Sequence, residues 1–403
     1  MITAVAALLS IRAQNFRSLK DISVDLGPLN VLVGPNQAGK SNFLDLIEFV
    51  GDSARFDLAG ALEMRGGIDR VRFRGATDSG SVVIDVDANV TRFSSATAPD
   101  EYRLSFWTRR QRTRRILLRN EQFKFKRTKG QGRRITVKGS SADFVQVQEG
   151  GEESDRRKLS LGSQSLALST LRRLPKAEGG DEIDRVARLF TTFRVFSVDV
   201  EAARRPSELD DRSASLAPDA SNLAAVLISL SSNEERFADF ISDARAMIPG
   251  LESIDFEALG GAGPAVAVRL TEQGLSSPTY LQDASFGAIR VLALLALLYD
   301  PEPPQITCIE EIDHGLHPYV FDRLVVRLRE ASKRTQILVA THSPALVNRL
   351  EAHELIVVER AADGSTLLPA VDPEEIRLKE QAADGRLGLG ELWFSGTLGG
   401  VPS

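Results

Sequence analysis

The segment with the most definite chemistry is a glycine-bounded loop, Gly34-Pro35-Asn36-Gln37-Ala38-Gly39-Lys40-Ser41. Gly34 and Gly39 let backbone N–H groups curl around the β- and γ-phosphates of a nucleotide, because no Cβ stands in the way. Lys40 adds a point charge, and Ser41 offers a hydroxyl to Mg²⁺. We therefore predict a phosphate-binding loop with contacts from Gly34, Pro35, Asn36, Gln37, Ala38, Gly39, Lys40, Ser41 and Asn42.

Two carboxylates follow a short apolar run in Ile306-Thr307-Cys308-Ile309-Glu310-Glu311. Such a run is typical of a buried parallel strand, and acids at its carboxyl end lie where open α/β sheets bind ligands. Glu310 would hold Mg²⁺, directly or through water, while Glu311 would orient and deprotonate the attacking water. The plainer alternative is a pair of surface acids after a strand. The phosphate-binding loop favours the catalytic interpretation.

A histidine and a serine–glycine motif complete the candidate site. His342 follows the apolar run 336–340, where it could hydrogen-bond the γ-phosphate or the attacking water. Ser285 and Gly287 precede an apolar helix, and a helix N-terminus favours anions. Ser285 could equally be a simple N-cap. We predict Lys40, Glu311 and His342 as the catalytic residues.

The pattern of apolar residues predicts the elements that position these groups. Two alternating runs within residues 8–33 predict strands, and helical spacing over 43–50 predicts a helix directly after the loop. Strand, glycine loop and helix are the context in which G-x-x-x-x-G-K-S is a phosphate site. We expect further strands at 82–90, 101–108, 114–126 and 133–138, and helices at 181–192 and 220–247.

Basic residues are concentrated in one segment. Residues 103–138 contain 14 Lys and Arg and one acid, Glu121, so the segment carries +13 although the whole chain carries −5. Such a concentration indicates a contact for DNA or RNA, and a solvated β-hairpin with charged edges is the alternative. Alternation places Phe123 and Phe125 on one face for packing and leaves the cations for phosphates. The candidate nucleic-acid residues are Arg109, Arg110, Arg112, Arg114, Arg115, Lys124 and Lys126.

Composition limits the class of protein. The chain has 403 residues, of which 26% are charged and 42% hydrophobic, as in a globular chain with two or three domain-sized units. Its single cysteine, Cys308, excludes an internal disulfide and favours a reducing cytoplasm. No apolar run reaches the roughly 18 residues of a membrane helix. We therefore expect a cytoplasmic protein with no membrane partner.

The order of these motifs resembles the ABC-type ATPase heads of the RecF, SMC and OLD group. The likeness covers Asn15-Phe16-Arg17-Ser18 and the segments 34–41, 285–290, 310–318 and 341–344. Within that group, residues 310–318 are similar to bacterial OLD-like ATPases, with Ile312 in place of the usual proline. The Ser285 motif departs from the LSGGQ of transporters, which argues against a transporter subunit.

The resemblance implies an α/β fold, an ABC-type P-loop ATPase head with a mixed sheet, an antiparallel β layer and a helical lobe. It implies a homodimer, or a higher oligomer built from dimers, that closes around ATP and Mg²⁺. Ser285, Gly287 and Arg290 would then reach the ATP of the other subunit. We expect one discontinuous head with an N-terminal lobe carrying the phosphate loop (Walker A) at 1–90, a basic β-rich insert at 91–165, a helical lobe at 166–275, and a C-terminal lobe with the signature, the Walker B acids and the switch histidine at 276–403.

The same resemblance suggests a biological role. OLD proteins append a Toprim nuclease after the head, but no Asp-x-Asp pair follows His342 in this sequence. We therefore expect a sensor or regulatory ATPase of a bacterial defence system that acts with a separately encoded nuclease-like effector. A RecF-like repair ATPase that binds DNA through the basic insert is the alternative.

Overall fold

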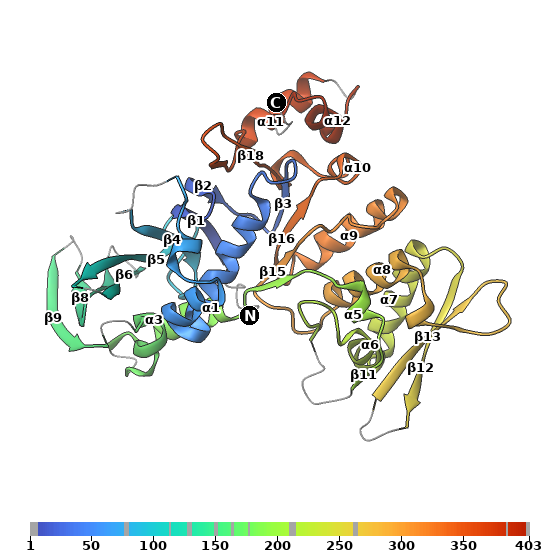
Figure 1. The fold of residues 1–403 in the computed structure, drawn as a ribbon, viewed down its shortest axis with the longest axis horizontal. Coiled ribbons are helices and arrows are strands. Elements are labelled where there is room, and N and C mark those ends of the chain that lie inside the picture. Colours follow the sequence, from blue (N-terminus) through green and yellow to red (C-terminus); the bar gives the residue numbers. More distant parts are fainter. Residues whose placement is uncertain are drawn as a thin grey trace.

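An antiparallel sheet forms one side of the molecule (Figure 1). The computed structural model describes residues 7–75, 80–112, 114–126, 131–148, 152–162, 165–175, 178–208, 215–260, 265–383 and 386–399. Eight strands form this sheet in the order β2-β1-β4-β5-β6-β7-β8-β9. Their bounds are β1 (Ala7–Phe16), β2 (Leu19–Asp25), β4 (Val82–Asn89), β5 (Asp100–Gln111), β6 (Arg114–Lys126), β7 (Gly132–Lys138), β8 (Ser141–Val147) and β9 (Glu153–Ser160).

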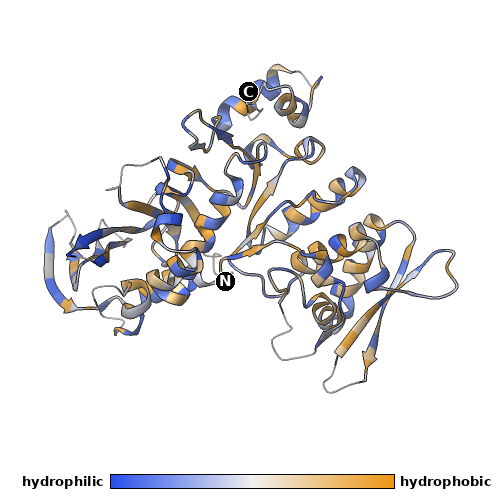
Figure 2. Ribbon diagram, in the orientation of Figure 1, coloured by the Kyte–Doolittle hydropathy of each residue, from blue (hydrophilic) through white to orange (hydrophobic). Residues whose placement is uncertain are grey.

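A parallel sheet lies at the centre of the molecule (Figure 1). It has the order β10-β15-β16-β3-β17, and each neighbouring pair is parallel. Both faces of the sheet are covered along β3, β15, β16 and β17, so these strands are buried throughout without alternation (Figure 2), whereas the edge strand β10 begins with the exposed Arg194. Their bounds are β3 (Leu29–Val33), β10 (Arg194–Phe196), β15 (Ile306–Ile309), β16 (Gln336–Thr341) and β17 (Leu355–Val357).

One apolar core fills the space between the two sheets. Helix α1 (Lys40–Met64) runs through it and packs with α3 (Ala167–Thr170) and α4 (Gly180–Thr191). The parallel sheet contributes Leu32, Leu338 and Ala340 to this core. Asp57 breaks the helical path of α1 with φ 65°, and its carboxylate accepts hydrogen bonds from the backbone N–H groups of Leu58 and Leu166, each 2.8 Å long.

A helical lobe covers the opposite face of the parallel sheet. Its core contains Val31, Val339 and Val357 from the sheet together with the apolar helix α8. The sequence pattern predicted a helix across 220–247, but the helix ends at Ser231 and a new one begins at Glu234, because Asn233 caps the backbone N–H of Arg236. The elements of the lobe are α5 (Val200–Ala203), α6 (Leu223–Ser231), α7 (Glu234–Met247), α8 (Phe286–Leu298), α9 (Phe321–Ala331), β11 (Ser207–Glu208), β12 (Leu251–Leu259), β13 (Ala265–Glu272) and β14 (Thr279–Tyr280).

The remaining elements are short and lie around the ends of the parallel strands. They are α2 (Ile68–Val71), α10 (Pro344–Val347), β18 (Glu359–Arg360), β19 (Thr366–Leu367), α11 (Pro373–Ala382) and α12 (Leu389–Phe394), with 3-10 turns at Leu171–Arg173, Leu281–Asp283, Pro318–Val320 and Ala352–Glu354. Strands β18 and β19 form a hairpin of their own. Among the described residues, no helix is both long and apolar enough to cross a membrane.

The lobes differ in their boundaries from those expected. The basic segment continues the antiparallel sheet, since β5 pairs with β4 and the strand order runs unbroken to β9. Residues 166–191 pack on this sheet and belong to its core rather than to the helical lobe. Helix α8 lies within the core of the helical lobe, beyond the expected end of that lobe at 275.

Candidate nucleotide site

Three of the parallel strands deliver the predicted groups to one edge of the sheet. Strand β16 lies between β15 and β3, with Thr341 opposite Val33 and Val339 opposite Ile309. The phosphate loop, Glu310 and His342 directly follow the ends of β3, β15 and β16. Because the carboxyl ends of parallel strands meet at the same edge, segments far apart in the sequence converge there.

Both glycines of the phosphate loop pack closely against neighbouring segments of the chain. Gly39 has φ 116°, and a Cβ there would lie 2.0 Å from the hydroxyl oxygen of Thr366. A Cβ at Gly34 would lie 2.2 Å from the carbonyl oxygen of Val358. These approaches explain why glycine is needed at both positions.

Lys40 points back into the phosphate loop. Its ammonium group donates hydrogen bonds to the carbonyl oxygens of Gly34, at 2.7 Å, and Pro35, at 3.0 Å. Burial lowers the pKa of Lys40, and the carboxylates of Asp313 and Glu311 oppose this shift. A phosphate that replaces these carbonyl partners would favour the charged ammonium.

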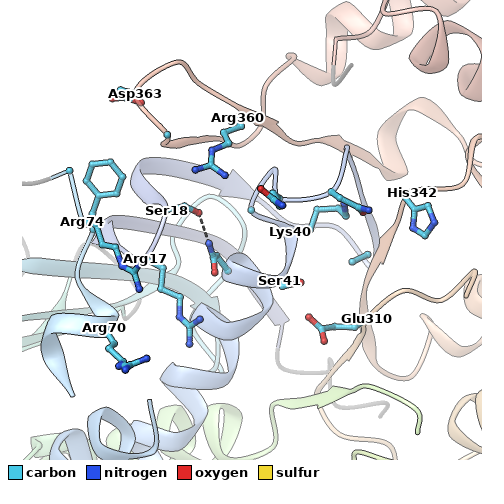
Figure 3. A pocket seen from close by; sticks show the side chains of 18 of the residues that line it. Arg17, Ser18, Lys40, Ser41, Arg70, Arg74, Glu310, His342, Arg360 and Asp363 are labelled. Carbon is cyan, nitrogen blue, oxygen red and sulfur yellow. Dashed lines mark hydrogen bonds between the residues drawn. The ribbon is translucent and has the colours of Figure 1, made fainter. Parts of the chain in front are cut away.

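A cavity of about 650 Å³ joins the loop to the other predicted groups (Figure 3). Its walls include Lys40, Ser41, Glu310, Glu311 and His342. Asn36, Gln37, Gly39 and Asn42 also line it, while Gly34, Pro35 and Ala38 lie in the loop behind them. The structure therefore brings the loop, both acids and the histidine to one cavity large enough for a nucleotide.

The two acids occupy different positions in this cavity. The backbone N–H of Glu310 donates a 2.9 Å hydrogen bond to the carbonyl of Phe196 on β10, which anchors the chain at the end of β15. Glu311 has φ 44°, and its exposed carboxylate lies 3.1 Å from the Nδ1 atom of His314. A hydroxyl from Ser41 and a carboxylate from Glu310 line the same cavity, and both are oxygen donors of the kind that Mg²⁺ takes.

His342 is held by a carboxylate from the loop after β15. Its Nδ1 atom lies 3.5 Å from Asp313, and the other carboxylate oxygen of Asp313 accepts a 2.6 Å hydrogen bond from the hydroxyl of Thr341. The Asp313 side chain is buried while the imidazole is half exposed. Asp313 thus positions His342 at the cavity wall.

The serine–glycine motif lies outside this cavity. The Ser285 hydroxyl oxygen accepts a 3.1 Å hydrogen bond from the backbone N–H of Ala288 and caps α8. Phe286 is exposed between Ser285 and Gly287, with its ring centroid 5.5 Å from that of His314. The role of Ser285 and Gly287 at the ATP of a second subunit stays a prediction.

Arg290, expected to reach the ATP of a second subunit, is buried inside its own subunit. Its side chain is only 4% exposed, and its guanidinium donates to the carbonyl oxygens of Val198, at 3.0 Å, Glu310, at 3.3 Å, and Glu311. The guanidinium is directed into its own subunit here, and its role at the ATP of a second subunit stays a prediction. The spacing of the motif gave the position of Arg290 on the helix but not the direction of its side chain.

Two further segments complete the cavity and were not predicted as site residues. The chain around α2 contributes Arg70, Arg72, Phe73, Arg74 and Gly75, and the β18–β19 hairpin contributes Arg360, Asp363 and Gly364. Asp363-Gly364 is a sequence signal for a tight hairpin turn. Nothing in the sequence indicates that this hairpin packs on the phosphate loop. Arg17 and Ser18, noted only for the resemblance, line the cavity too.

The candidate nucleic-acid residues divide into paired and unpaired cations. Lys124 and Lys126 both form ion pairs with Glu101, and Arg115 forms one with Asp69. The side chains of Arg109, Arg110, Arg112 and Arg114 are exposed at the tip of the β5–β6 hairpin and form no ion pair within the described ranges.

The inner face of the basic segment packs as predicted, with one unexpected feature. Phe123 and Phe125 are buried in the core, as the alternation indicated. Arg119 and Glu121 lie beside them as a buried ion pair at 3.2 Å, so Arg119 adds nothing to the basic surface.

Solved structures confirm the ABC-type fold. An SMC head bound to the C-winged helix domain of ScpA is 14% identical, with a TM-score of 0.54 over 90% of this chain and 97% of that one. An SMC head domain with an extended coiled coil, bound to the C-terminal domain of ScpA and derived from Pyrococcus furiosus, is 14% identical, with a TM-score of 0.53 over 95% of this chain and 100% of that one.

Sequence comparisons give the family. An OLD nuclease of Thermus scotoductus is 50% identical over 40 residues, so the match spans 10% of this chain and only 8% of the nuclease. The model of the family described as "AAA domain, putative AbiEii toxin, Type IV TA system" matches residues 29–348. That match begins in β3, ends after His342 and contains the predicted loop, signature and acids. The chain belongs to this AAA-domain family and has the fold of ABC-type ATPase heads such as those of SMC proteins.

Proposed function

We propose that the chain binds and hydrolyses ATP with Mg²⁺ and closes as a head-to-tail dimer around the nucleotide. The observation that carries the proposal is the single cavity shared by Lys40, Ser41, Glu310, Glu311 and His342. These residues come from three strand ends of one parallel sheet. A structural role alone would not require a lysine, two acids and a histidine around a hollow of this size.

Each residue has a separate task in the proposed reaction. The backbone of the phosphate loop and Lys40 bind the β- and γ-phosphates. Glu311 accepts the proton of the attacking water, and His342 hydrogen-bonds the γ-phosphate or that water. The carboxylate of Glu311 lies 3.1 Å from the Nδ1 atom of His314, so closure of the dimer would have to release it from this contact before it could act as the base.

The residues also fit a divalent cation. Ser41 and Glu310 would hold Mg²⁺, which supplies charge neutralisation between the β- and γ-phosphate oxygens. Glu310 has one methylene more than the aspartate usual at this position, so its carboxylate can reach the ion directly or through a water. The described residues contain no group of three or more His, Cys, Asp and Glu side chains arranged as a metal cluster.

We further propose that this ATPase is the sensor or regulatory part of a bacterial defence system in the cytoplasm, acting with a separately encoded nuclease-like effector. The family description and the short match to an OLD nuclease support this role. The effector would bind differently to the open and the closed state of the dimer. Co-purification with a nuclease-like protein would support it, and co-purification with DNA alone would contradict it.

The second candidate function is a RecF-like ATPase that binds DNA. The exposed arginines at the tip of the β5–β6 hairpin favour it, namely Arg109, Arg110, Arg112 and Arg114. Their charge could neutralise backbone phosphates without reading sequence. Stimulation of the ATPase by duplex DNA would distinguish this function from the first.

Two variants test the ATPase itself. Lys40→Ala should abolish nucleotide binding, because the loop then lacks its cation. Glu311→Gln should retain binding, lower hydrolysis by about 10²–10⁴-fold and accumulate an ATP-bound dimer in size-exclusion chromatography. Hydrolysis at the native rate in Glu311→Gln would show that the base is another residue.

A further inference from the structure

The β18–β19 hairpin is fastened to the phosphate loop. The hydroxyl of Thr366 donates a 2.9 Å hydrogen bond to the carbonyl of Ala38 and lies 2.7 Å from the Ser18 hydroxyl. The backbone N–H of Thr366 donates to the carbonyl of Ser18 at 2.8 Å. A second tie comes from Lys20, whose ammonium lies 2.8 Å from Asp363 in the hairpin turn. The hairpin therefore has a fixed position over the loop.

The pairing of the hairpin fixes the direction of Arg360. Arg360 lies directly opposite Thr366 in the antiparallel pair. Opposite residues point to the same face, with Cβ atoms roughly 4.5–5.5 Å apart. Thr366 points at the phosphate loop, so the Arg360 side chain extends from the same face over the mouth of the cavity (Figure 3).

Arg360 lies at the end of the cavity away from the hydrolytic groups. Figure 3 shows Arg360 and His342 on opposite sides of Lys40. Glu310 and His342 mark the γ-phosphate end, so the end near Arg360 would receive the adenosine half of ATP. The wall contributed by the chain around α2, which includes Phe73, completes that end.

At this end of the cavity, an arginine is better placed than an aromatic ring to stack on a base. Phe73 is only 6% exposed, so little of its ring is open to a base. Arg360 is exposed and its side chain forms no ion pair or hydrogen bond within the part of the chain that the structure describes. A planar guanidinium stacks on aromatic faces, whereas a lysine ammonium does not.

We infer that Arg360 is a nucleotide-specificity residue that stacks on the purine base of ATP bound to its own subunit. This inference rests on the proposed ATP binding at Lys40. The β18–β19 hairpin would then position the purine base relative to the phosphate loop, because the contact between Thr366 and Ala38 fixes the hairpin on that loop. Loss of Arg360 should weaken the binding of the nucleoside half of ATP and leave the binding of the phosphates unchanged.

The test compares Arg360→Ala and Arg360→Lys, using calorimetric titration with ATP, UTP and inorganic tripolyphosphate. Arg377→Ala is the control, because Arg377 is an exposed α11 residue whose charged partner is Glu374. Both Arg360 variants should bind ATP about 10-fold more weakly and lose most of the preference for ATP over UTP. Tripolyphosphate affinity should stay within about 2-fold of native.

Three outcomes would overturn the inference. Equal losses for ATP and tripolyphosphate, with rescue by Arg360→Lys, would assign Arg360 to a phosphate. Unchanged ATP binding in both variants would show that the base lies elsewhere. A native chain that binds neither ATP nor tripolyphosphate would refute the proposed function itself, which distinguishes that failure from the first two.

Discussion

Arg290 on α8 and Glu311 after β15 are joined through the backbone, since the guanidinium of Arg290 donates to the carbonyl oxygen of Glu311. The same guanidinium also holds the carbonyls of Glu310 and Val198. The helix that begins at Ser285 is therefore tied to the segment that carries both acids. A shift of α8 when two subunits meet would therefore move Glu311. In this way dimer closure would be coupled to the position of the proposed catalytic base.

Replacing Arg290 tests this coupling. Arg290→Lys keeps the charge, but a lysine ammonium lacks the planar set of donors with which the guanidinium binds three carbonyl oxygens. The backbone of Glu310 and Glu311 would therefore lose hydrogen bonds. We expect kcat to fall about 10-fold or more while the Kd for ATP stays near native, because the phosphate loop is untouched. Arg236→Lys on α7, at a partly buried position that does not line the cavity, is the control. A parallel loss of ATP affinity would indicate that Arg290 contacts nucleotide after all.

The shared-site geometry predicts complementation between two inactive chains. Lys40→Ala removes phosphate binding, and Ser285→Arg blocks the surface offered to the partner's ATP. Each variant alone should be inactive, and an equimolar mixture should recover one working site per heterodimer in a steady-state ATPase assay. Ser285→Ala, which removes the capping hydroxyl without adding bulk, is the control for the loss of about 1 kcal/mol of capping energy. Native activity from Ser285→Arg alone would refute the in trans role.

The local parts of the site could be predicted from the sequence. Each predicted group comes after an apolar run that marks the end of a strand, and such a run can be recognised in the local sequence. The groups are the phosphate loop, Glu310, Glu311 and His342. Because parallel strands end at one edge, their convergence also follows from the fold class.

The parts set by tertiary packing could not be predicted. Arg290 lies in a helix buried almost all round, so its spacing did not show whether it faces the partner or its own subunit. Arg360 reaches the site only because β17 pairs with β3, which carries the hairpin after β17 to the phosphate loop. The boundary expected at residue 90 lies at the end of the predicted strand 82–90, and the strand pairing of β4 with β5 continues across it.

The tip of the β5–β6 hairpin should carry any nucleic-acid contact. Arg112→Glu with Arg114→Glu should weaken binding to duplex DNA or to RNA and lower the log–log salt slope on the duplex by about 2, at about 0.9 per phosphate contact. ATP binding should be unchanged. Lys333→Glu with Arg377→Glu, a reversal of equal size elsewhere, is the control. Unchanged nucleic-acid binding together with loss of a protein partner would make the tip an effector dock and remove support for the repair function.

The buried pair of Arg119 and Glu121 holds the first turn of α3 against the antiparallel sheet. The Glu121 carboxylate accepts hydrogen bonds from the backbone N–H groups of Ala167, at 2.7 Å, and Leu168, at 3.3 Å, and the Arg119 guanidinium donates to the carbonyl of Gly139 at 3.0 Å. Burial outweighs these donors and raises the pKa of Glu121 from 4.5 to about 7. The folded chain then keeps a proton on Glu121 that the unfolded chain has released.

This difference predicts a pH-dependent stability. Below pH 4.5 both states bind the proton and its contribution is complete, whereas between pH 4.5 and about 7 the contribution is lost as the pH rises. Glu121→Gln cannot titrate, so it serves as the reference whose own stability does not change through this group. The free energy of unfolding of the native chain, measured relative to the variant by urea titration, should therefore fall by about 3 kcal/mol across this window. A difference that rises with pH would mean that Arg119 keeps Glu121 ionised and that the pair acts as a permanent salt bridge.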